Sequence, residues 1–235
     1  RFKLAHAYSG RAIDKMPKLL GFGSIPISVA GIMEQRLNAC QLGDKHLHNL
    51  WWYNQFHSGD SIIYHPDGRI KIVPDSETLK SINSNTPLRW NSKRQILQTG
   101  TFDKIQGEEF SRKDIQKFAN ITHSNSKEVL ENPIWVALAR GDKELLKEYA
   151  DQVYFKNNNS FSRFARAYTN SLMNVWILDK TPDFEAEDLW HFDSLNGYSD
   201  VMGIQGLDYD YGYLVGIPPK TNLETLIEDI NQARN

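Results

Sequence analysis

The sequence lacks the residues that several common protein classes require. It has one cysteine, Cys40, so no disulfide can form within the chain and no cluster of thiolates can bind zinc. No apolar run approaches the roughly 20 residues of a membrane-spanning helix. Positive charge is not in excess, because 27 Lys and Arg face 29 Asp and Glu, which leaves no strong signal for nucleic-acid binding. We therefore expect a soluble, cytoplasmic protein.

Motifs that identify familiar enzymes are also missing. The chain contains no Walker A sequence, no His-Glu-x-x-His and no Gly-x-Ser-x-Gly. The segment 21–24 begins like a dinucleotide-binding loop, but Pro26 stands where that loop needs a glycine. The sequence therefore points to no particular reaction.

The composition is that of an ordinary globular protein. A chain of 235 residues with 40% hydrophobic and 24% charged residues is long enough to bury a proper core. We expect a single domain over residues 1–235, with a weak boundary near 83–92, where Asn, Ser and Pro accumulate. Residues 176–219 carry nine acids against Lys180 alone, and residues 1–20 carry five cations against Asp14 alone. Such runs usually form solvated faces, although an acidic cation site or a basic arm is an alternative.

The clearest local signal is a β-hairpin. Ser61–His65 and Arg69–Val73 lie on either side of Pro66-Asp67-Gly68. Ile62 and Tyr64 would share one face of the first strand, and Ile70 and Ile72 alternate with Arg69 and Lys71 in the second. Pro66 and Asp67 suit a type I turn, and Gly68 supplies the left-handed residue of a three-residue loop.

Other patterns predict helices and a few further strands. Helices are expected over 27–40, 45–57, 143–155 and 223–233, and a capping box at 111–114 opens another. Strands are expected over 96–102, 175–178 and 211–217. Because strands and helices do not alternate regularly, we predict an α+β fold: mixed helices with a β-hairpin and a small, mainly antiparallel sheet.

Four of the seven histidines lie close together in the sequence. They are His46, His48, His57 and His65, and they surround Trp51-Trp52. If 45–57 is one helix, His46 and His57 share a face but lie about 16 Å apart along the axis. One metal with bonds near 2.0–2.1 Å cannot contact both. A metal site would therefore use one or two of these histidines with an acid from elsewhere.

The acids that could complete such a site lie near the C-terminus. Asp193 follows His191 with the His-x-Asp spacing of non-haem iron sites, but no further histidine comes after it. Asp208 and Asp210 would share one face of an extended segment, an arrangement that suits hard cations. The simpler interpretation of that pair is a solvated edge with tyrosines packed behind it.

Two classes of function follow. We favour a non-catalytic binding or interaction protein with a protein or small-molecule partner, and we expect Trp51 and Trp52 to form its contact surface. The alternative is a metal-dependent hydrolase that holds a divalent metal. Its candidate ligands are His46, His48, His57, His65, Asp193, Asp208 and Asp210. The hydrolase requires at least two of the histidines to approach an acid in one pocket, and the binding surface requires an exposed tryptophan.

Overall fold

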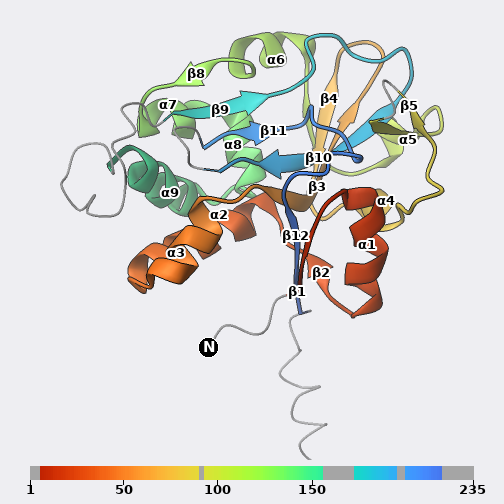
Figure 1. The fold of residues 1–235 in the computed structure, drawn as a ribbon. Helices are drawn as coiled ribbons and strands as arrows, with labels where there is room; N and C mark the ends of the chain where they lie inside the picture. Colours follow the sequence, from red (N-terminus) through yellow and green to blue (C-terminus); the bar gives the residue numbers. More distant parts are fainter. Residues whose placement is uncertain (1–5, 90–92, 156–171, 195–198, 219–235) are drawn as a thin grey trace, which may run out of the picture.

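The computed structural model describes residues 6–89, 93–155, 172–194 and 199–218 (Figure 1). Its strands are β1 (His6–Ser9), β2 (Ile25–Pro26), β3 (Phe56–Tyr64), β4 (Ile70–Val73), β5 (Leu88–Arg89), β6 (Arg94–Ile96), β7 (Glu108–Phe110), β8 (Thr122–His123), β9 (Met173–Trp176), β10 (Ala186–Phe192), β11 (Val201–Met202) and β12 (Tyr213–Ile217). Its helices are α1 (Ala12–Gly21), α2 (Val29–Gln41), α3 (Lys45–Trp52), α4 (Glu77–Lys80), α5 (Thr101–Lys104), α6 (Arg112–Phe118), α7 (Ser126–Glu131), α8 (Pro133–Leu138) and α9 (Lys143–Phe155).

These strands join into one large sheet. Its main path runs β1-β12-β3-β10-β11-β9-β8, and β2, β4, β5, β6 and β7 attach beside that path. Two neighbouring pairs are parallel, namely β12 with β3 and β11 with β9. The prediction of a small, mainly antiparallel sheet is therefore wrong, because the described residues form a mixed sheet of 12 strands.

Strand β10 explains much of that error. It lies at the centre of the sheet, where it pairs with β3, β6 and β11. All seven of its residues are buried, yet they include Glu187, Asp188 and His191. A strand covered on both faces usually appears in the sequence as an apolar run. The polar residues of β10 break that run, so no local pattern predicts a strand here.

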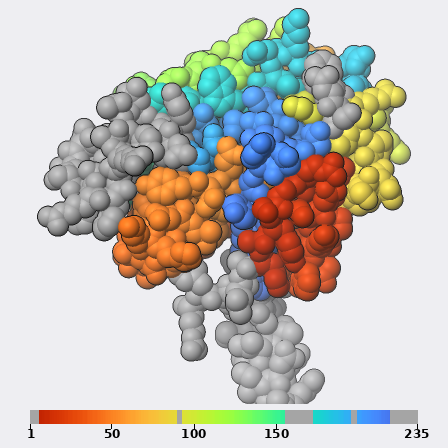
Figure 2. Space-filling view, in the orientation of Figure 1, coloured from red at the N-terminus to blue at the C-terminus, as the bar shows by residue number. Residues whose placement is uncertain are grey.

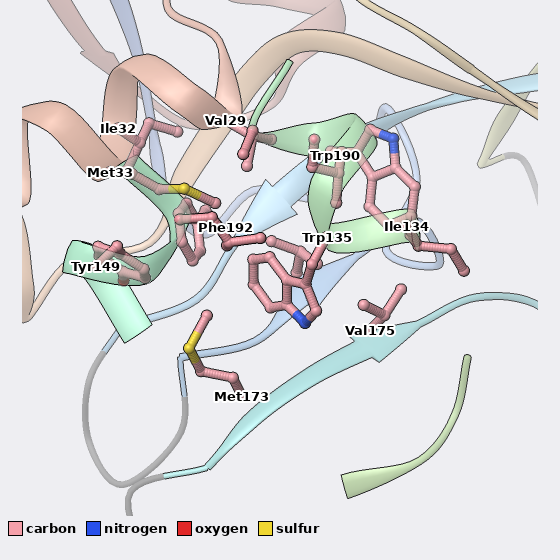
Figure 3. Close-up of a cluster of buried hydrophobic side chains, with 14 of the residues drawn as sticks. Val29, Ile32, Met33, Ile134, Trp135, Tyr149, Met173, Val175, Trp190 and Phe192 are labelled. Atoms are coloured by element: carbon pink, nitrogen blue, oxygen red, sulfur yellow. The ribbon is translucent and has the colours of Figure 1, made fainter. Parts of the chain in front are cut away.

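Helices cover both faces of the central strands. Ala186, Trp190 and Phe192 of β10 belong to a core that α2, α7, α8 and α9 complete. In Figure 3 the ring of Trp135 on α8 lies between Phe192 and the strand that carries Met173 and Val175. Leu189 belongs to a second core, with α1 and α4. Burying one such side chain contributes roughly 1.5–3 kcal/mol, so these two cores hold the sheet between the helices.

The predicted hairpin is confirmed. β3 and β4 pair antiparallel, with Tyr64 opposite Ile70. The main-chain N–H of Gly68 donates to the oxygen of His65 at 3.0 Å, which closes the turn. Gly68 has φ +98°, a conformation that favours glycine.

Several element boundaries differ from the expectation. α2 begins after Ser28, whose hydroxyl accepts the N–H of Gly31, while Pro26 lies in β2. The expected helix 45–57 ends at Trp52, because β3 already begins at Phe56. The expected strand 96–102 divides into the end of β6 and the start of α5. The helix over 143–155 and the Ser111 capping box are confirmed, and the expected helix 223–233 lies outside the described residues.

The acidic C-terminal stretch is not simply a solvated face. Glu185 accepts the main-chain N–H groups of Gly100 and Phe102, and Glu187 accepts the hydroxyls of Ser76 and Thr78. Two further acids are also buried with partners, namely Asp188 beside Arg94 and Asp200 beside Asn174 and Trp176. Buried carboxylates need such partners, so these four acids are part of the interior.

The segment 83–92, expected to be a weak boundary, contains β5, which pairs with β6. The single-domain organisation of residues 1–235 stays a prediction. No helix among the described residues is both long and apolar enough to cross a membrane.

Candidate functional site

Two histidines from the central strands meet inside the protein. His57 on β3 and His191 on β10 are cross-strand partners, and their Nδ1 atoms lie 3.0 Å apart. The rings meet edge to face with centroids 4.7 Å apart, and both side chains are buried. A hydrogen bond between two Nδ1 atoms needs one N–H and one lone pair, so the two imidazoles must be opposite tautomers.

Burial keeps this pair uncharged. Loss of solvation lowers the pKa of His57 to about 4. It lowers the pKa of His191 well below the ordinary value, and the neighbouring His57 lowers it further. At neutral pH the pair is therefore a neutral, hydrogen-bonded link between β3 and β10.

Tyr209 lies against both imidazoles and starts a chain of hydrogen bonds. Its ring meets His57 and His191 edge-on, with centroids 6.4 and 5.3 Å away. The Tyr209 hydroxyl donates to Oε1 of Gln55 at 3.3 Å, and Nε2 of Gln55 donates to Oδ1 of Asp193 at 2.6 Å. Burial, with Asp193 nearby, raises the pKa of Tyr209, so its hydroxyl keeps its proton. Three segments distant in the sequence are thus joined by polar side chains.

Residues 206–212, here called the tyrosine loop, are fixed by their main chain. Leu207 accepts the N–H of Ile13 and donates to the oxygen of Lys93, while Gly212 accepts the N–H of Gly10. Gly212 has φ +116°, and a Cβ placed on it would lie 3.3 Å from Nε2 of His57. The sequence thus places a glycine where the loop must pass close to the histidine pair.

The outer side of the tyrosine loop reaches solvent. Tyr211 is 68% exposed, and its ring lies 5.6 Å from that of Tyr209. Asp210 is exposed beside it, and Asp208 is half-buried. In Figure 2 the blue segment that leads into β12 reaches the surface between the red N-terminal segment and the orange α2–α3 segment. The loop therefore presents an exposed aromatic ring among carboxylates.

A buried arginine supports the inner end of this site. Arg36 on α2 is fully buried and stacks on Phe192, with its guanidinium carbon 4.3 Å from the ring centre. It donates to the main-chain oxygens of Trp51, Asn54 and Asp193 and to the hydroxyl of Tyr149. Arg36 therefore fixes the main chain next to Gln55 and at Asp193, the two residues that link to Tyr209.

The structure brings four of the seven candidate metal ligands into this region. They are His57, Asp193, Asp208 and Asp210. The other three lie elsewhere: His46 is exposed on α3, and His48 stacks on Trp52 with ring centres 5.9 Å apart. His65 lies 2.8 Å from Asp67 within its own hairpin. Among the described residues no group of three His, Cys, Asp or Glu side chains could hold a metal ion.

The tryptophan doublet does not provide the expected contact surface. Trp51 and Trp52 are 7% and 1% exposed. Trp51 stacks on Phe56, and Trp52 stacks on Tyr149 and donates to the main-chain oxygen of Arg36. Both rings belong to the core because α3 packs on α2 and places them against Phe56 and Tyr149.

Sequence reasoning missed Gln55, Tyr209 and Tyr211 as members of the site. The sequence pattern predicts that the two tyrosines pack behind a solvated acidic edge, whereas Tyr211 is the most exposed of the large apolar side chains described. The available signal was the sequence Asp208-Tyr209-Asp210-Tyr211-Gly212, in which tyrosines alternate with aspartates before a glycine. Gln55 left no signal, because its role depends on contacts with residues 138 and 154 positions away.

The sequence matches no protein-family model and no curated protein. A solved structure described as the accommodation of massive sequence variation in Nanoarchaeota by the C-type lectin fold is similar, with a TM-score of 0.65 and 14% sequence identity. The similarity covers 91% of this chain and 96% of that chain. A likeness of this extent at such low identity shows the fold, which is the C-type lectin fold.

Proposed function

We propose that the chain is a non-catalytic binding protein whose recognition surface is the tyrosine loop. The observation that carries this proposal is the 68% exposure of Tyr211 on a loop that is hydrogen-bonded to α1, Gly10 and Lys93. An exposed tyrosine on a fixed main chain offers a large contact area with few torsions to immobilise, which is why tyrosine is frequent in binding surfaces.

The polar groups around Tyr211 define the kind of partner. Asp210 is exposed, and Asp208 and Asp193 are half-buried nearby. Arg11 is close enough for Asp208 and Asp210 to raise its pKa, but its strongest partner is Asp14, whose Oδ2 lies 2.7 Å from Nε. The surface therefore offers mainly acceptors and negative charge, and a protein or small-molecule partner with exposed donors or cationic groups suits it.

The fold supports a binding role. The similar Nanoarchaeota structure is described as one in which the C-type lectin fold accommodates massive sequence variation. A scaffold that keeps its core while other positions change suits recognition by loops. In this chain Asp210 and Tyr211 are the exposed residues of the tyrosine loop, whereas Leu207 belongs to the second core, so changes at these two exposed positions need not alter the sheet.

The metal-dependent hydrolase has less support. Of its four candidate histidines only His57 lies in the site region, and its ring contacts His191 and Tyr209 instead of a carboxylate. We therefore derive no catalytic step from this arrangement.

The binding proposal can be tested with an immobilised library of random peptides as the probe. Peptides selected on the native protein should bind the Tyr211→Ala variant at least about tenfold more weakly, as expected for an aromatic at the centre of an interface. Phe22→Ala is the matched control, because Phe22 is another exposed aromatic, at 64%, outside the tyrosine loop. Equal loss in both variants, or loss only in Phe22→Ala, would refute the assignment of the surface.

A further inference from the structure

A second candidate site lies away from the tyrosine loop, between α6, the β3–β4 turn and the segment after β9. A cleft of about 200 Å³ opens there. Its apolar lining includes Ile115 on α6 and Ile177 and Leu178 after β9. This volume is smaller than that of the usual pocket for drug-sized ligands, so any occupant must be small or must insert only one end.

Two exposed cations line this cleft. Arg112 on α6 and Lys180 both line it, and neither forms an ion pair with any residue that the structure describes. The position of Arg112 is constrained, because its aliphatic carbons pack over Gly68, where an added Cβ would come within 3.1 Å of Cδ. Two like charges at one cleft leave a site for an anion, which would interact favourably with both.

The third charged residue of the cleft, Asp179, already accepts a hydrogen bond within the protein. Oδ1 of Asp179 accepts a hydrogen bond from Nδ2 of Asn120 at 2.9 Å. Oδ1 of Asn120 in turn accepts the N–H of Ile177, also at 2.9 Å. Asn120 therefore fixes the segment that forms one wall, so the cleft has a defined shape and keeps an excess of positive charge.

We infer that this cleft binds a small carboxylate that carries a short apolar chain, with the carboxylate between Arg112 and Lys180 and the chain against Ile115 and Leu178. The guanidinium of Arg112 can donate two hydrogen bonds to one carboxylate, a geometry that suits this ligand class. The site is separate from the tyrosine loop and does not depend on the function proposed for that loop.

Hexanoate is the probe for this site. Its binding is monitored through the chemical shifts of the backbone amides of the full chain. We expect saturable shifts in residues 112–116 and 177–181. Hexan-1-ol keeps only the apolar chain and acetate keeps only the carboxylate, so each should bind clearly more weakly than hexanoate. Equal binding of acetate or of hexanol, or shifts outside these segments, would overturn the inference.

Substitutions of the charged residues test independently whether the carboxylate lies between Arg112 and Lys180. Arg112→Gln and Lys180→Gln should each weaken hexanoate binding by roughly tenfold, the effect of losing one charge-assisted hydrogen bond. Asp179→Asn should strengthen binding, because it removes a negative charge while Oδ1 can still accept from Asn120. Lys113→Gln is the matched control, since it removes a cation from the same helix but outside the lining. If Lys113→Gln weakens binding as much as Arg112→Gln, the cleft is not the site.

Discussion

Arg36 donates through Nη2 to the main-chain oxygen of Asp193 at 2.6 Å, across 157 positions of sequence. The same guanidinium reaches the oxygens of Trp51 and Asn54. Arg36 is fully buried and forms no ion pair with a carboxylate of the described residues. Its charge is stabilised instead by main-chain and hydroxyl oxygens and by the Phe192 ring. This contact sets the position of the segment that holds Asp193 beside Gln55.

Arg36→Lys should therefore be costly although it keeps the charge. Lysine cannot reproduce the planar set of donors, so an ammonium and several acceptors would stay buried without partners. We expect the free energy of unfolding in urea to fall by about 3 kcal/mol. Arg89→Lys is the control, because Arg89 is exposed and the change there should stay within about 0.5 kcal/mol. A variant at Arg36 that is as stable as the native protein would contradict this role.

The histidine pair predicts a dependence of stability on pH. The pKa of His57 is about 4 in the folded protein against an ordinary 6.5, so between these values the unfolded chain binds more protons. The contribution of neutral His57 to the free energy of unfolding is therefore fully present above about pH 6.5. It is lost as the pH drops toward 4, a decrease of about 3 kcal/mol. Asp188 and Asp200 act in the opposite direction, because burial raises their pKa values to about 7 and about 6.

A paired variant separates these effects. The double change His57→Gln and His191→Gln removes both imidazoles and leaves the two aspartates in place. The free energy of unfolding of this variant should decline less between pH 7 and pH 4 than that of the native protein. If the two curves run parallel over this range, the imidazoles do not carry the acid sensitivity.

A side chain at Gly212 should destabilise the folded protein. It has φ +116°, and an added Cβ would lie 3.3 Å from both the Gln55 oxygen and Nε2 of His57. We expect Gly212→Ala to reduce the free energy of unfolding by roughly 1–3 kcal/mol. Gly43→Ala is the comparison, because Gly43 also has a positive φ, +65°, but has no atom within 4 Å of its added Cβ. An effect at Gly212 no larger than that at Gly43 would mean that the close approach is not limiting.

The parts of the fold that the sequence predicts correctly are those set by local chemistry. The hairpin at Pro66-Asp67-Gly68 and the capping box at Ser111 depend on residues within three or four positions of one another. No local pattern predicts strand β10, because its polar residues pair with groups far away in the sequence: Ser76 donates to Glu187, and Nε of Arg94 lies 3.4 Å from Oδ2 of Asp188.

The same reason limits prediction of the site. His57, Asp193, Asp208 and Asp210 could be selected as polar residues in suggestive patterns. Their common location depends on the pairing of β3 with β10 and of β3 with β12, which no local pattern reveals. His57 and His191 are 134 positions apart, so neither the pair nor the Tyr209 ring above it could be derived from spacing.

The binding role of the tyrosine loop is tested most directly by locating a bound partner. A peptide selected on the immobilised native protein would be titrated into the ¹⁵N-labelled chain, and the amides whose signals move would be assigned. We predict that the largest changes fall in residues 206–212 and in 53–55, with Tyr211 among them. Changes confined to the surface around Phe22, to α3 or to the Arg112 cleft, with the tyrosine loop unaffected, would contradict it.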